Sequence, residues 1–439
     1  MEKAREQLQV LKEKAFLVGA YRRDQKFDRK QDHLLELMAL AETAGAVVVG
    51  RTQQRLNRIH PGTYIGSGKA QELAEVVERL GVNVVIFDND LSPGQIRELE
   101  EIIKVKVLDR SELILDIFAT RAQTKQAKLQ VELAQLEYTY PRLTRMWLHL
   151  DSVAGAGGAT AAGAVGGIGT RGTGEKQLEI DRRLVSKRIT ELKRELETID
   201  KRKLREIDGR RDFYTLCLVG YTNAGKSTLM NALTDAGAYV EDKLFATLDT
   251  RTRKWRVDSG IKVLLSDTVG FVSKLPHHLV ASFKATLEEA LRADLLLHVV
   301  DASSPQVFEQ IQSVGQVLKE IGCGDKEVLT LLNKSDTIHN RQLFDTLQTV
   351  RPDAIAISAK TGMNLDKLAA AVAQKMRGGQ VRFHIQISPA EGKLLSFLRA
   401  NAVNLNERYN GDTVDIEVTL GKNQFVQFRK LGVTDYEMI

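Results

Sequence analysis

The segment GYTNAGKST, residues 220–228, constrains the fold of this 439-residue chain more than any other stretch. It fits the pattern Gly-x4-Gly-Lys-Ser, in which a glycine-rich loop connects a strand to a helix. The apolar run FYTLCLV at 213–219 predicts the strand, and STLMNALTDAG from residue 227 predicts the helix. This order predicts an α/β domain built around a phosphate-binding loop.

Each residue type in this loop has a separate task in nucleotide binding. Gly220 and Gly225 let backbone N–H groups turn inward around the phosphates. Lys226 reaches the β- and γ-phosphate oxygens and is a candidate catalytic residue, while Ser227 offers a hydroxyl to Mg²⁺. The other loop positions expected to contact the nucleotide are Tyr221, Thr222, Asn223, Ala224 and Thr228. The alternative is a glycine turn that precedes a helix by chance, and the motifs described below argue against it.

Length and composition place the chain among multidomain globular proteins. At 439 residues and 43% hydrophobic content, it has material for about three domains. No apolar run approaches the ~20 residues of a membrane span, and the charged N-terminal sequence lacks the apolar region of a signal peptide. Cys217 and Cys323 have no metal-ligand spacing around them. We therefore expect a cytoplasmic protein whose cysteines are reduced and structural.

Four segments with different patterns follow one another along the chain. Short apolar runs alternate with helical patterns over 1–110, which predicts a parallel α/β domain. A long antiparallel helical hairpin is expected at 111–211, and the P-loop GTPase domain at 212–378. A small α+β domain at 379–439 is expected to end on the strand QFVQFRKL. The expected fold class is therefore α/β, with these four parts.

Two helical patterns with apolar seams predict the hairpin. The seam residues are Leu129, Leu133, Leu136 and Tyr140 in the first helix, and Val185, Ile189, Leu192, Leu196 and Ile199 in the second. The first helix is expected to run without a break from Ser111 to His149. Between the helices, 154–174 contains nine glycines and six alanines, so we interpret it as a mobile tip. A plain linker is the alternative, although long structureless loops usually carry function.

The chain is basic, with a formal net charge of +6 and a concentration of charge in the second hairpin helix. Twelve lysines and arginines lie between Arg182 and Arg211, against seven acids that end at Asp212. This excess is compatible with contact to nucleic acid. An exposed helix with i,i+4 ion pairs would have a similar sequence, so both interpretations stay open.

Two further segments predict the switches of a nucleotide-dependent protein. FATLD, residues 245–249, lies about twenty residues after the loop, where a first switch is expected. Thr247 is the candidate second Mg²⁺ ligand, and Asp267 ends a predicted strand, where it can hold Mg²⁺ through water. Gly270 can donate its N–H to the γ-phosphate, so Thr247 and Gly270 join Lys226 as catalytic candidates. The full nucleotide-contacting set here is Phe245, Ala246, Thr247, Leu248, Asp249, Asp267, Thr268, Val269 and Gly270.

Two short motifs near the ends of later strands predict that the base is guanine. In NKSD, Asp336 can accept hydrogen bonds from the guanine N1–H and 2-amino group, which adenine lacks. The SAK backbone can donate to the guanine O6. The residues of these motifs are Asn333, Lys334, Ser335, Asp336, Ser358, Ala359 and Lys360. Either motif alone could be a surface turn, but five motifs in the expected order favour a GTP-binding protein.

These motifs resemble the HflX family, within the Obg-HflX group of translation-associated P-loop GTPases. The matching strings are PGTYIGSGK (61–69), VVIFDNDLSPGQ (84–95), GGIGTRGTGEKQLEIDRR (166–183), GYTNAGKSTLMNAL (220–233), FATLD (245–249) and DTVGFV (267–272). The resemblance covers roughly residues 10–375. Three positions depart from the usual form: Thr173 and Thr250 replace proline, and Lys176 replaces threonine. The first change could loosen the tip, and none removes a nucleotide ligand.

The resemblance implies a GTP hydrolase that ribosomes stimulate. It implies binding to the large ribosomal subunit and its rRNA, with the hairpin tip directed toward the peptidyl-transferase centre. GTP binding and hydrolysis would then control ribosome splitting or rescue. The expected partners are accordingly GTP, GDP and the ribosome, and we expect a monomer that uses Mg²⁺. Two rival functions are an ATP- or GTP-driven RNA-remodelling enzyme and an RNA-binding scaffold with nucleotide as a conformational ligand.

Two positions bear on the rate of hydrolysis. Phe271 follows Gly270, where many switch GTPases carry a glutamine that orients the attacking water. A phenyl ring cannot hydrogen-bond water in this way, so we expect slow intrinsic hydrolysis. Asn223 resembles the asparagine with which some related GTPases bind K⁺ between the α- and γ-phosphates. A loop asparagine that hydrogen-bonds its own backbone is the alternative.

Overall fold

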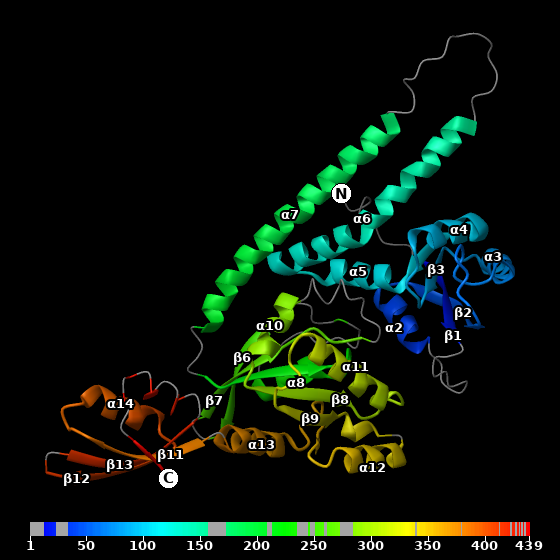
Figure 1. The fold of residues 1–439 in the computed structure, drawn as a ribbon. Coiled ribbons are helices and arrows are strands. Elements are labelled where there is room, and N and C mark those ends of the chain that lie inside the picture. Colours follow the sequence, from blue (N-terminus) through cyan, green and yellow to red (C-terminus); the bar gives the residue numbers. More distant parts are fainter. Residues whose placement is uncertain are drawn as a thin grey trace, which may run out of the picture. The chain divides into compact units, whose positions relative to one another are not determined.

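The structure is a computed structural model, and its described residues form two compact units (Figure 1). The described residues are 13–22, 34–156, 173–208, 213–234, 245, 251–258, 261–272, 284–338, 340–378, 380–411, 413–421, 424–425, 428–429, 431, 433 and 436–439. The first unit is Met1–Asp200 with Glu241–Asp249 and Val269–Thr286, and the second is Lys201–Val240, Thr250–Thr268 and Leu287–Ile439. The predicted glycine-rich tip lies outside the described residues between 157 and 172.

The first unit contains a four-stranded parallel sheet in the order β2-β1-β3-β4. Its strands are β1 (Lys14–Arg22), β2 (Val47–Leu56), β3 (Val84–Phe87) and β4 (Lys106–Asp109). Its helices are α2 (Leu35–Thr43), α3 (Ser67–Leu80), α4 (Pro93–Ile103) and α5 (Arg110–Arg121). Alternate residues of β1 belong to two apolar clusters, one with α2 and α5 and the other with α3 and α4. Burial on both faces explains why β1 and β3 are largely apolar runs, as the sequence predicted for a parallel α/β domain.

The helix predicted to run from Ser111 to His149 is broken, so that expectation was wrong. The chain forms α5 and then α6 (Lys125–Ala156), with Ala122 in an extended conformation between them. The side-chain oxygen of Thr124 accepts a hydrogen bond from the Ala127 N–H at 3.1 Å and so caps the start of α6. The apolar pattern continues through the break, which is why periodicity alone did not reveal it.

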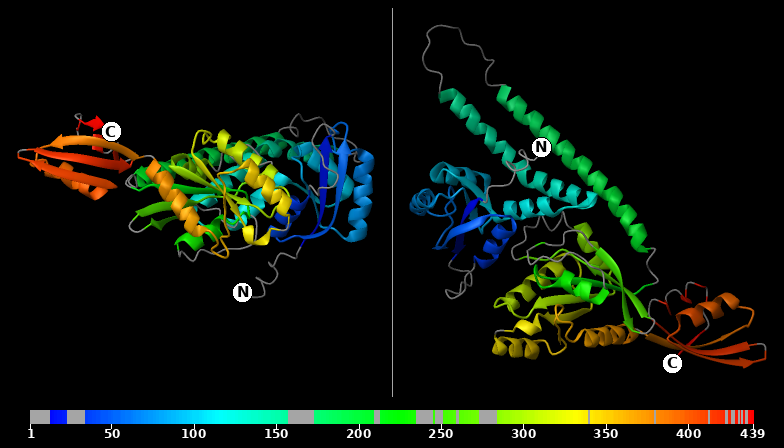
Figure 2. Two further views of the ribbon diagram at one scale, coloured as in Figure 1. Left: turned by 90° about the horizontal axis from the view of Figure 1, so that it is seen from below. Right: turned by 180° about the vertical axis from the view of Figure 1, so that it is seen from behind.

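Helix α6 pairs with α7 (Thr173–Asp208), and the two run side by side in Figure 1 and in the right view of Figure 2. The apolar seam between them is made by Leu129, Leu133, Leu192 and Leu196, packed against Leu136, Ile189 and Ile199. Ion pairs flank the seam, with Arg188 Nε 2.8 Å from Glu132 Oε1 and Lys193 Nζ 2.8 Å from Glu137 Oε1.

Helix α6 contains Pro141 and changes direction along its length, as expected where proline removes a backbone donor (Figure 1).

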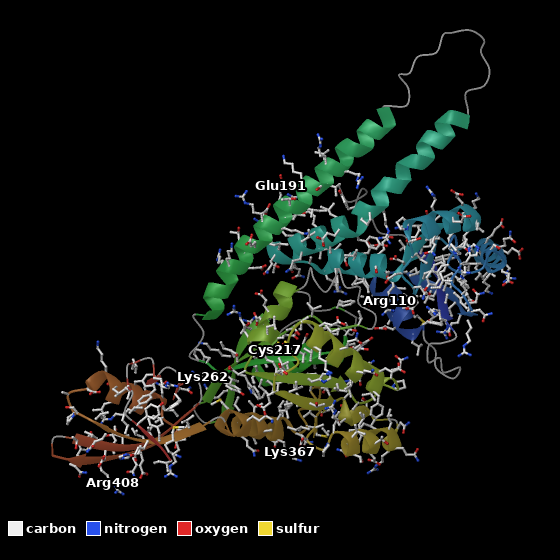
Figure 3. The ribbon with its side chains drawn as sticks, in the orientation of Figure 1. Arg110, Glu191, Cys217, Lys262, Lys367 and Arg408 are labelled. Atoms are coloured by element: carbon white, nitrogen blue, oxygen red, sulfur yellow. The ribbon has the colours of Figure 1, made fainter. Side chains whose placement is uncertain are left out.

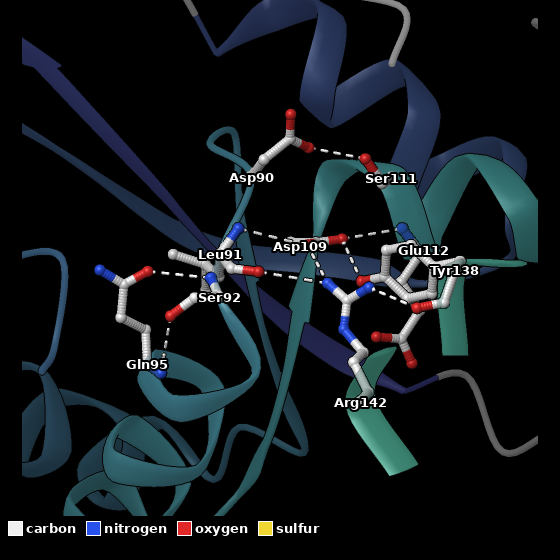
Figure 4. A network of polar contacts seen from close by, with 9 residues as sticks. All are labelled: Asp90, Leu91, Ser92, Gln95, Asp109, Ser111, Glu112, Tyr138 and Arg142. Atoms are coloured by element: carbon white, nitrogen blue, oxygen red, sulfur yellow. Dashed lines mark hydrogen bonds and ion pairs between the residues drawn. The ribbon is translucent and has the colours of Figure 1, made fainter. Parts of the chain in front are cut away.

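A buried polar network joins α6 to the carboxyl end of the parallel sheet (Figure 4). Its centre is Asp109, which is fully buried and accepts hydrogen bonds from Tyr138 Oη at 2.7 Å and the Glu112 N–H at 2.9 Å. Arg142 lies 3.0 Å from Asp109 Oδ2, donates to the Leu91 carbonyl oxygen at 3.2 Å, and stacks over the Tyr138 ring. The Asp109 carboxylate accepts hydrogen bonds from both α5 and α6. The network therefore fixes α6 on the sheet around Tyr138 and Arg142.

The second unit contains a six-stranded sheet in the order β10-β9-β8-β5-β7-β6, in which only β6 is antiparallel to its neighbour. Its strands are β5 (Thr215–Gly220), β6 (Arg251–Asp258), β7 (Ile261–Asp267), β8 (Leu295–Asp301), β9 (Val328–Asn333) and β10 (Ile355–Ala356). The accompanying helices are α8 (Lys226–Thr234), α10 (Lys284–Arg292), α11 (Val307–Glu320), α12 (Arg341–Val350) and α13 (Leu365–Gly378), with the 3-10 turn η1 (Ser335–Thr337). The carboxyl ends of the parallel strands lie at one edge of this sheet, where α/β folds bind ligands.

The cysteines of this second unit are buried. Cys217 lies within β5 (Figure 3) and Cys323 follows α11, and neither forms a disulfide. Burial raises the pKa of both thiols, most strongly for Cys217. A raised pKa disfavours the reactive thiolate, which agrees with the structural role expected for them.

The C-terminal segment forms a small sheet in the order β12-β13-β11-β14. Its elements are β11 (Gln380–Ile387), α14 (Gly392–Asn401), β12 (Asn404–Asn410), β13 (Thr413–Gly421) and β14 (Glu437–Met438). The strand predicted at QFVQFRKL was wrong, because Gln424, Phe425, Phe428 and Arg429 are helical. The rings of Phe425 and Phe428 instead pack on Phe383, at centroid distances of 5.1 and 4.7 Å.

In the described part of the chain, no helix combines the length and apolar character needed to cross a membrane.

Candidate functional site

The glycine-rich loop leaves β5 at Gly220 and enters α8 at Lys226. Gly220 has φ +153°, and a Cβ at this position would overlap the carbonyl oxygen of Val299 on the neighbouring strand β8. Gly225 has φ +92°, and a Cβ there would overlap the side-chain amide of Asn333. Both positions therefore require glycine, for backbone conformation and for space. The loop leads into the N-terminus of α8, and backbone N–H groups at a helix N-terminus suit a phosphate group.

Lys226 is the buried cation of this loop, with 6% of its surface exposed. Its Nζ donates hydrogen bonds to the carbonyl oxygens of Gly220 at 3.0 Å and Tyr221 at 2.7 Å. Burial lowers the pKa of Lys226 to about 8, although the nearby Asp267 carboxylate raises it. An ammonium group held in this way is stabilised by a bound anion, as a phosphate would provide.

Two oxygen-bearing side chains, Ser227 and Asp267, meet beside the loop. The Ser227 hydroxyl donates to Asp267 Oδ2 at 2.7 Å, which joins the first residue after the lysine to the end of β7. The adjacent Thr268 is fully buried and its hydroxyl donates to the Leu218 carbonyl oxygen at 2.7 Å, which fixes the backbone after Asp267. A hydroxyl and a carboxylate are hard oxygen donors, so this pair fits Mg²⁺ rather than a soft transition metal.

At the other end of the site, Asn333 connects three segments that lie far apart in the sequence. Its Nδ2 donates to the Ala224 carbonyl oxygen at 2.8 Å, and its Oδ1 accepts from the Ala359 N–H at 2.9 Å. The glycine-rich loop, the NKSD segment and the SAK segment are thereby brought to one edge of the sheet. Asp336 and Lys360 are exposed, while Ser358 is fully buried and accepts from the Thr361 N–H.

The two predicted switch segments are only partly described. Ala246, Thr247, Leu248 and Asp249 lie outside the described residues. Phe245 is buried in the apolar core of the first unit, with its ring edge-on to Phe118 of α5 at a centroid distance of 4.6 Å. Val269 and Val272 belong to the same core. Phe245 of the first predicted switch segment and Val269 of the second therefore pack in the core of the first unit.

Sequence reasoning did not single out Asp301, the last residue of β8. Its carboxylate Oδ2 lies 2.8 Å from Nζ of Lys334 in the NKSD segment. The signal that could have found it is position, because LLLHVVD ends in an acidic residue and polar residues at the carboxyl ends of parallel strands line ligand sites.

His298, in the middle of β8, makes the stability of this unit depend on pH. Its pKa is lowered to about 4, by burial first and then by the positive charges of Arg351 and Lys226. Because the folded pKa lies below the unfolded value of about 6.5, protons bind the unfolded chain more tightly. Stability from the neutral ring is therefore complete above about pH 6.5 and is lost as the pH falls toward 4.

We expect urea unfolding of the wild-type protein to lose about 2–3 kcal/mol more between pH 7.5 and 4.5 than unfolding of His298→Leu. Leucine keeps the apolar volume of the strand and removes the titrating group. The free energy of unfolding is to be measured for both proteins at both pH values. Equal losses would show that His298 does not contribute the pH dependence.

The parallel sheet, the glycine-rich loop and the segments gathered by Asn333 define this protein as a P-loop GTPase. Three family models match the chain: "GTP-binding GTPase N-terminal" at 31–119, "GTP-binding GTPase Middle Region" at 121–210 and "50S ribosome-binding GTPase" at 215–334. A GTPase HflX from Lacrimispora saccharolytica is 42% identical, covering 95% of this chain and 96% of its own length. The GTPase HflX of Escherichia coli is 40% identical, covering 92% of each chain. The chain belongs to the HflX family of GTPases, and it hydrolyses GTP.

Among solved structures, the chain is similar to a GTP-binding protein from the archaeon Sulfolobus solfataricus in complex with GDP. The two are 26% identical over 82% of this chain and 98% of that chain, with a TM-score of 0.41.

Proposed function

We propose that this GTPase binds the large ribosomal subunit through its helical hairpin and uses GTP binding and hydrolysis to split or rescue ribosomes. The observation that carries the proposal is the α6–α7 pair, which is joined through a glycine- and alanine-rich sequence. With 36 residues, α7 is about 54 Å long at ~1.5 Å per residue. A rod of this length with small residues at its end could reach into a narrow RNA-lined space. The family description of residues 215–334 as a 50S ribosome-binding GTPase supports the same partner.

The charges of α7 support a role on RNA for part of the helix only. Arg188 and Lys193 form ion pairs with α6, so they belong to the hairpin seam. Arg194 is exposed. An exposed arginine is suited to an RNA backbone, which requires charge rather than base readout.

In the proposed cycle, Lys226 holds the β- and γ-phosphates and stabilises the charge that develops during hydrolysis. Ser227 and Asp267 would hold Mg²⁺, which supplies charge neutralisation between these phosphates when bound. From the two switch segments, we propose that Thr247 binds Mg²⁺ and that the Gly270 N–H donates to the γ-phosphate. Phe271 is buried at 3% exposure and cannot orient water. The ribosome would therefore have to supply the group that orients the attacking water.

We expect purified large ribosomal subunits to raise GTP turnover at least about tenfold, and deletion of 154–174 to abolish that stimulation. The deletion should leave the Kd for GTP unchanged, because the hydrogen bonds of the nucleotide site come from other segments. Turnover is to be measured with and without large subunits, alongside sedimentation with a non-hydrolysable GTP analogue.

Two controls make this experiment specific. Arg194→Glu should weaken sedimentation with large subunits, whereas Lys367→Glu on α13 (Figure 3) should have no effect. If large subunits fail to stimulate turnover by the intact protein, the proposed function is wrong. If the tip deletion weakens GTP binding and stimulation equally, the segment serves folding rather than the ribosome.

Asn223 is the proposed ligand for K⁺ at the phosphate site. It is exposed in the loop with φ +59°, a conformation that asparagine tolerates well. Among the described residues its side chain makes no hydrogen bond to its own backbone, which favours the cation interpretation over the alternative. We expect GTP turnover to be about tenfold faster in KCl than in NaCl, and Asn223→Ala to remove the difference. Equal turnover of the wild type in both salts would contradict a K⁺ site.

A further inference from the structure

Asp301 and Lys334 come together because of the parallel pairing of β8 and β9. Asp301 ends β8 and is the direct partner of Asn333, which ends β9. The Ala302 N–H donates to the Asn333 carbonyl oxygen at 2.9 Å and extends this pairing one step beyond the strands. Lys334 then turns sharply, with φ +61°, so that its side chain returns toward β8. Lys334 belongs to the NKSD motif and Asp301 does not, so the pair depends on tertiary structure.

The Asp301 carboxylate is held in one orientation. Its Oδ1 accepts hydrogen bonds from the Ser303 N–H at 3.0 Å and the Ser303 hydroxyl at 2.6 Å. This leaves Oδ2 for Lys334, whose Nζ lies 2.8 Å away. The side chains are 17% and 31% exposed, so the ion pair is shielded from water more than an ordinary surface pair. A fixed acceptor in a partly buried site restricts the long Lys334 side chain to one conformation.

We propose that Asp301 is a positioning residue for guanine nucleotides, which acts by holding the Lys334 side chain across the place of the base. The inference rests on the proposed placement of guanine beside Asp336. Lys334 lies two residues before Asp336, and the methylene stem of a lysine can cover a flat apolar surface while its ammonium group stays paired. By pairing with that ammonium, Asp301 orders the stem before the nucleotide arrives, so binding does not have to restrict a freely moving side chain.

The test is a double-mutant cycle on Kd for GTP and GDP. Asp301→Asn should raise both Kd values by about tenfold, since it removes the charge while an amide oxygen can still accept from Ser303. Lys334→Met keeps an unbranched stem but removes the ammonium, so it should have a similar effect. In the Lys334→Met background, Asp301→Asn should add less than about twofold, because its effect passes through the lysine. For Asp301→Asn the loss should appear as a raised KM for GTP rather than as a lowered kcat, because the substitution acts on binding and not on the reacting phosphates.

Two controls separate the possible outcomes. Asn340→Ala removes a polar side chain of the same unit that caps α12 by accepting from the Leu343 N–H, and it should leave Kd unchanged. Asp336→Ala should weaken GTP and GDP binding, because that residue is proposed to contact the base. If Asp336→Ala has no effect, the placement of the base is wrong and the inference is overturned with it. If Asp336→Ala weakens binding but the effects of Asp301→Asn and Lys334→Met are absent or simply additive, only the positioning role is overturned.

Discussion

Replacement of Lys226 by alanine is expected to weaken GTP binding by about 100- to 1,000-fold, the largest effect of any single substitution in the nucleotide site. The lysine is the one residue of the loop that combines a full positive charge with burial at 6% exposure. The expected loss of charge-assisted hydrogen bonds from Lys226 to the phosphate oxygens accounts for this magnitude. Affinity is to be measured by isothermal titration calorimetry, with fluorescent GDP as a second probe.

The same variant should fold at least as well as the wild type in the absence of nucleotide. A buried ammonium is costly, and its removal relieves that cost once the carbonyl oxygens of Gly220 and Tyr221 can reach water. Lys367→Ala on the exposed face of α13 is the matched control, and its Kd should equal that of the wild type. An unchanged Kd for Lys226→Ala would overturn the assignment of the phosphate site.

Replacement of Asn333 by alanine is expected to lower the free energy of unfolding by about 2–4 kcal/mol and to weaken GTP binding by at least about tenfold. The substitution leaves two buried backbone groups without their partner, the Ala224 carbonyl oxygen and the Ala359 N–H. It thereby releases the glycine-rich loop and the SAK segment from each other. Denaturant unfolding and calorimetry on the same preparation measure both effects.

Asn340→Ala provides the matched comparison for this substitution. Asn340 caps α12 by accepting from the Leu343 N–H at 3.1 Å, and its loss should cost about 1 kcal/mol without changing the Kd for GTP. If Asn333→Ala behaves like Asn340→Ala, with lower stability and normal affinity, then Asn333 supports the fold but does not organise the nucleotide site.

Sequence patterns were sufficient where local chemistry decides structure. Gly220 and Gly225 could be read from the chain because each is needed for a backbone conformation that other residues adopt poorly. Patterns failed at Ala122, where a local cap on Thr124 breaks a helix whose apolar repeat continues. They failed again at β12, whose sequence NLNERYN has little apolar alternation and becomes a strand by pairing with β13.

The sequence by itself determined the class of the nucleotide, the order of its motifs and the family, because glycine, lysine, serine and aspartate at fixed spacing have few other uses. Only the tertiary structure decided which distant residues act together. Asn333 meets Ala224 across 109 positions, and Asp301 meets Lys334, because parallel strands end at one edge of a sheet. The sequence does not predict either of these two contacts, because the strand order that brings the residues together depends on how the strands pack. The same holds for Phe245, a predicted switch residue whose side chain lies in the core of the first unit.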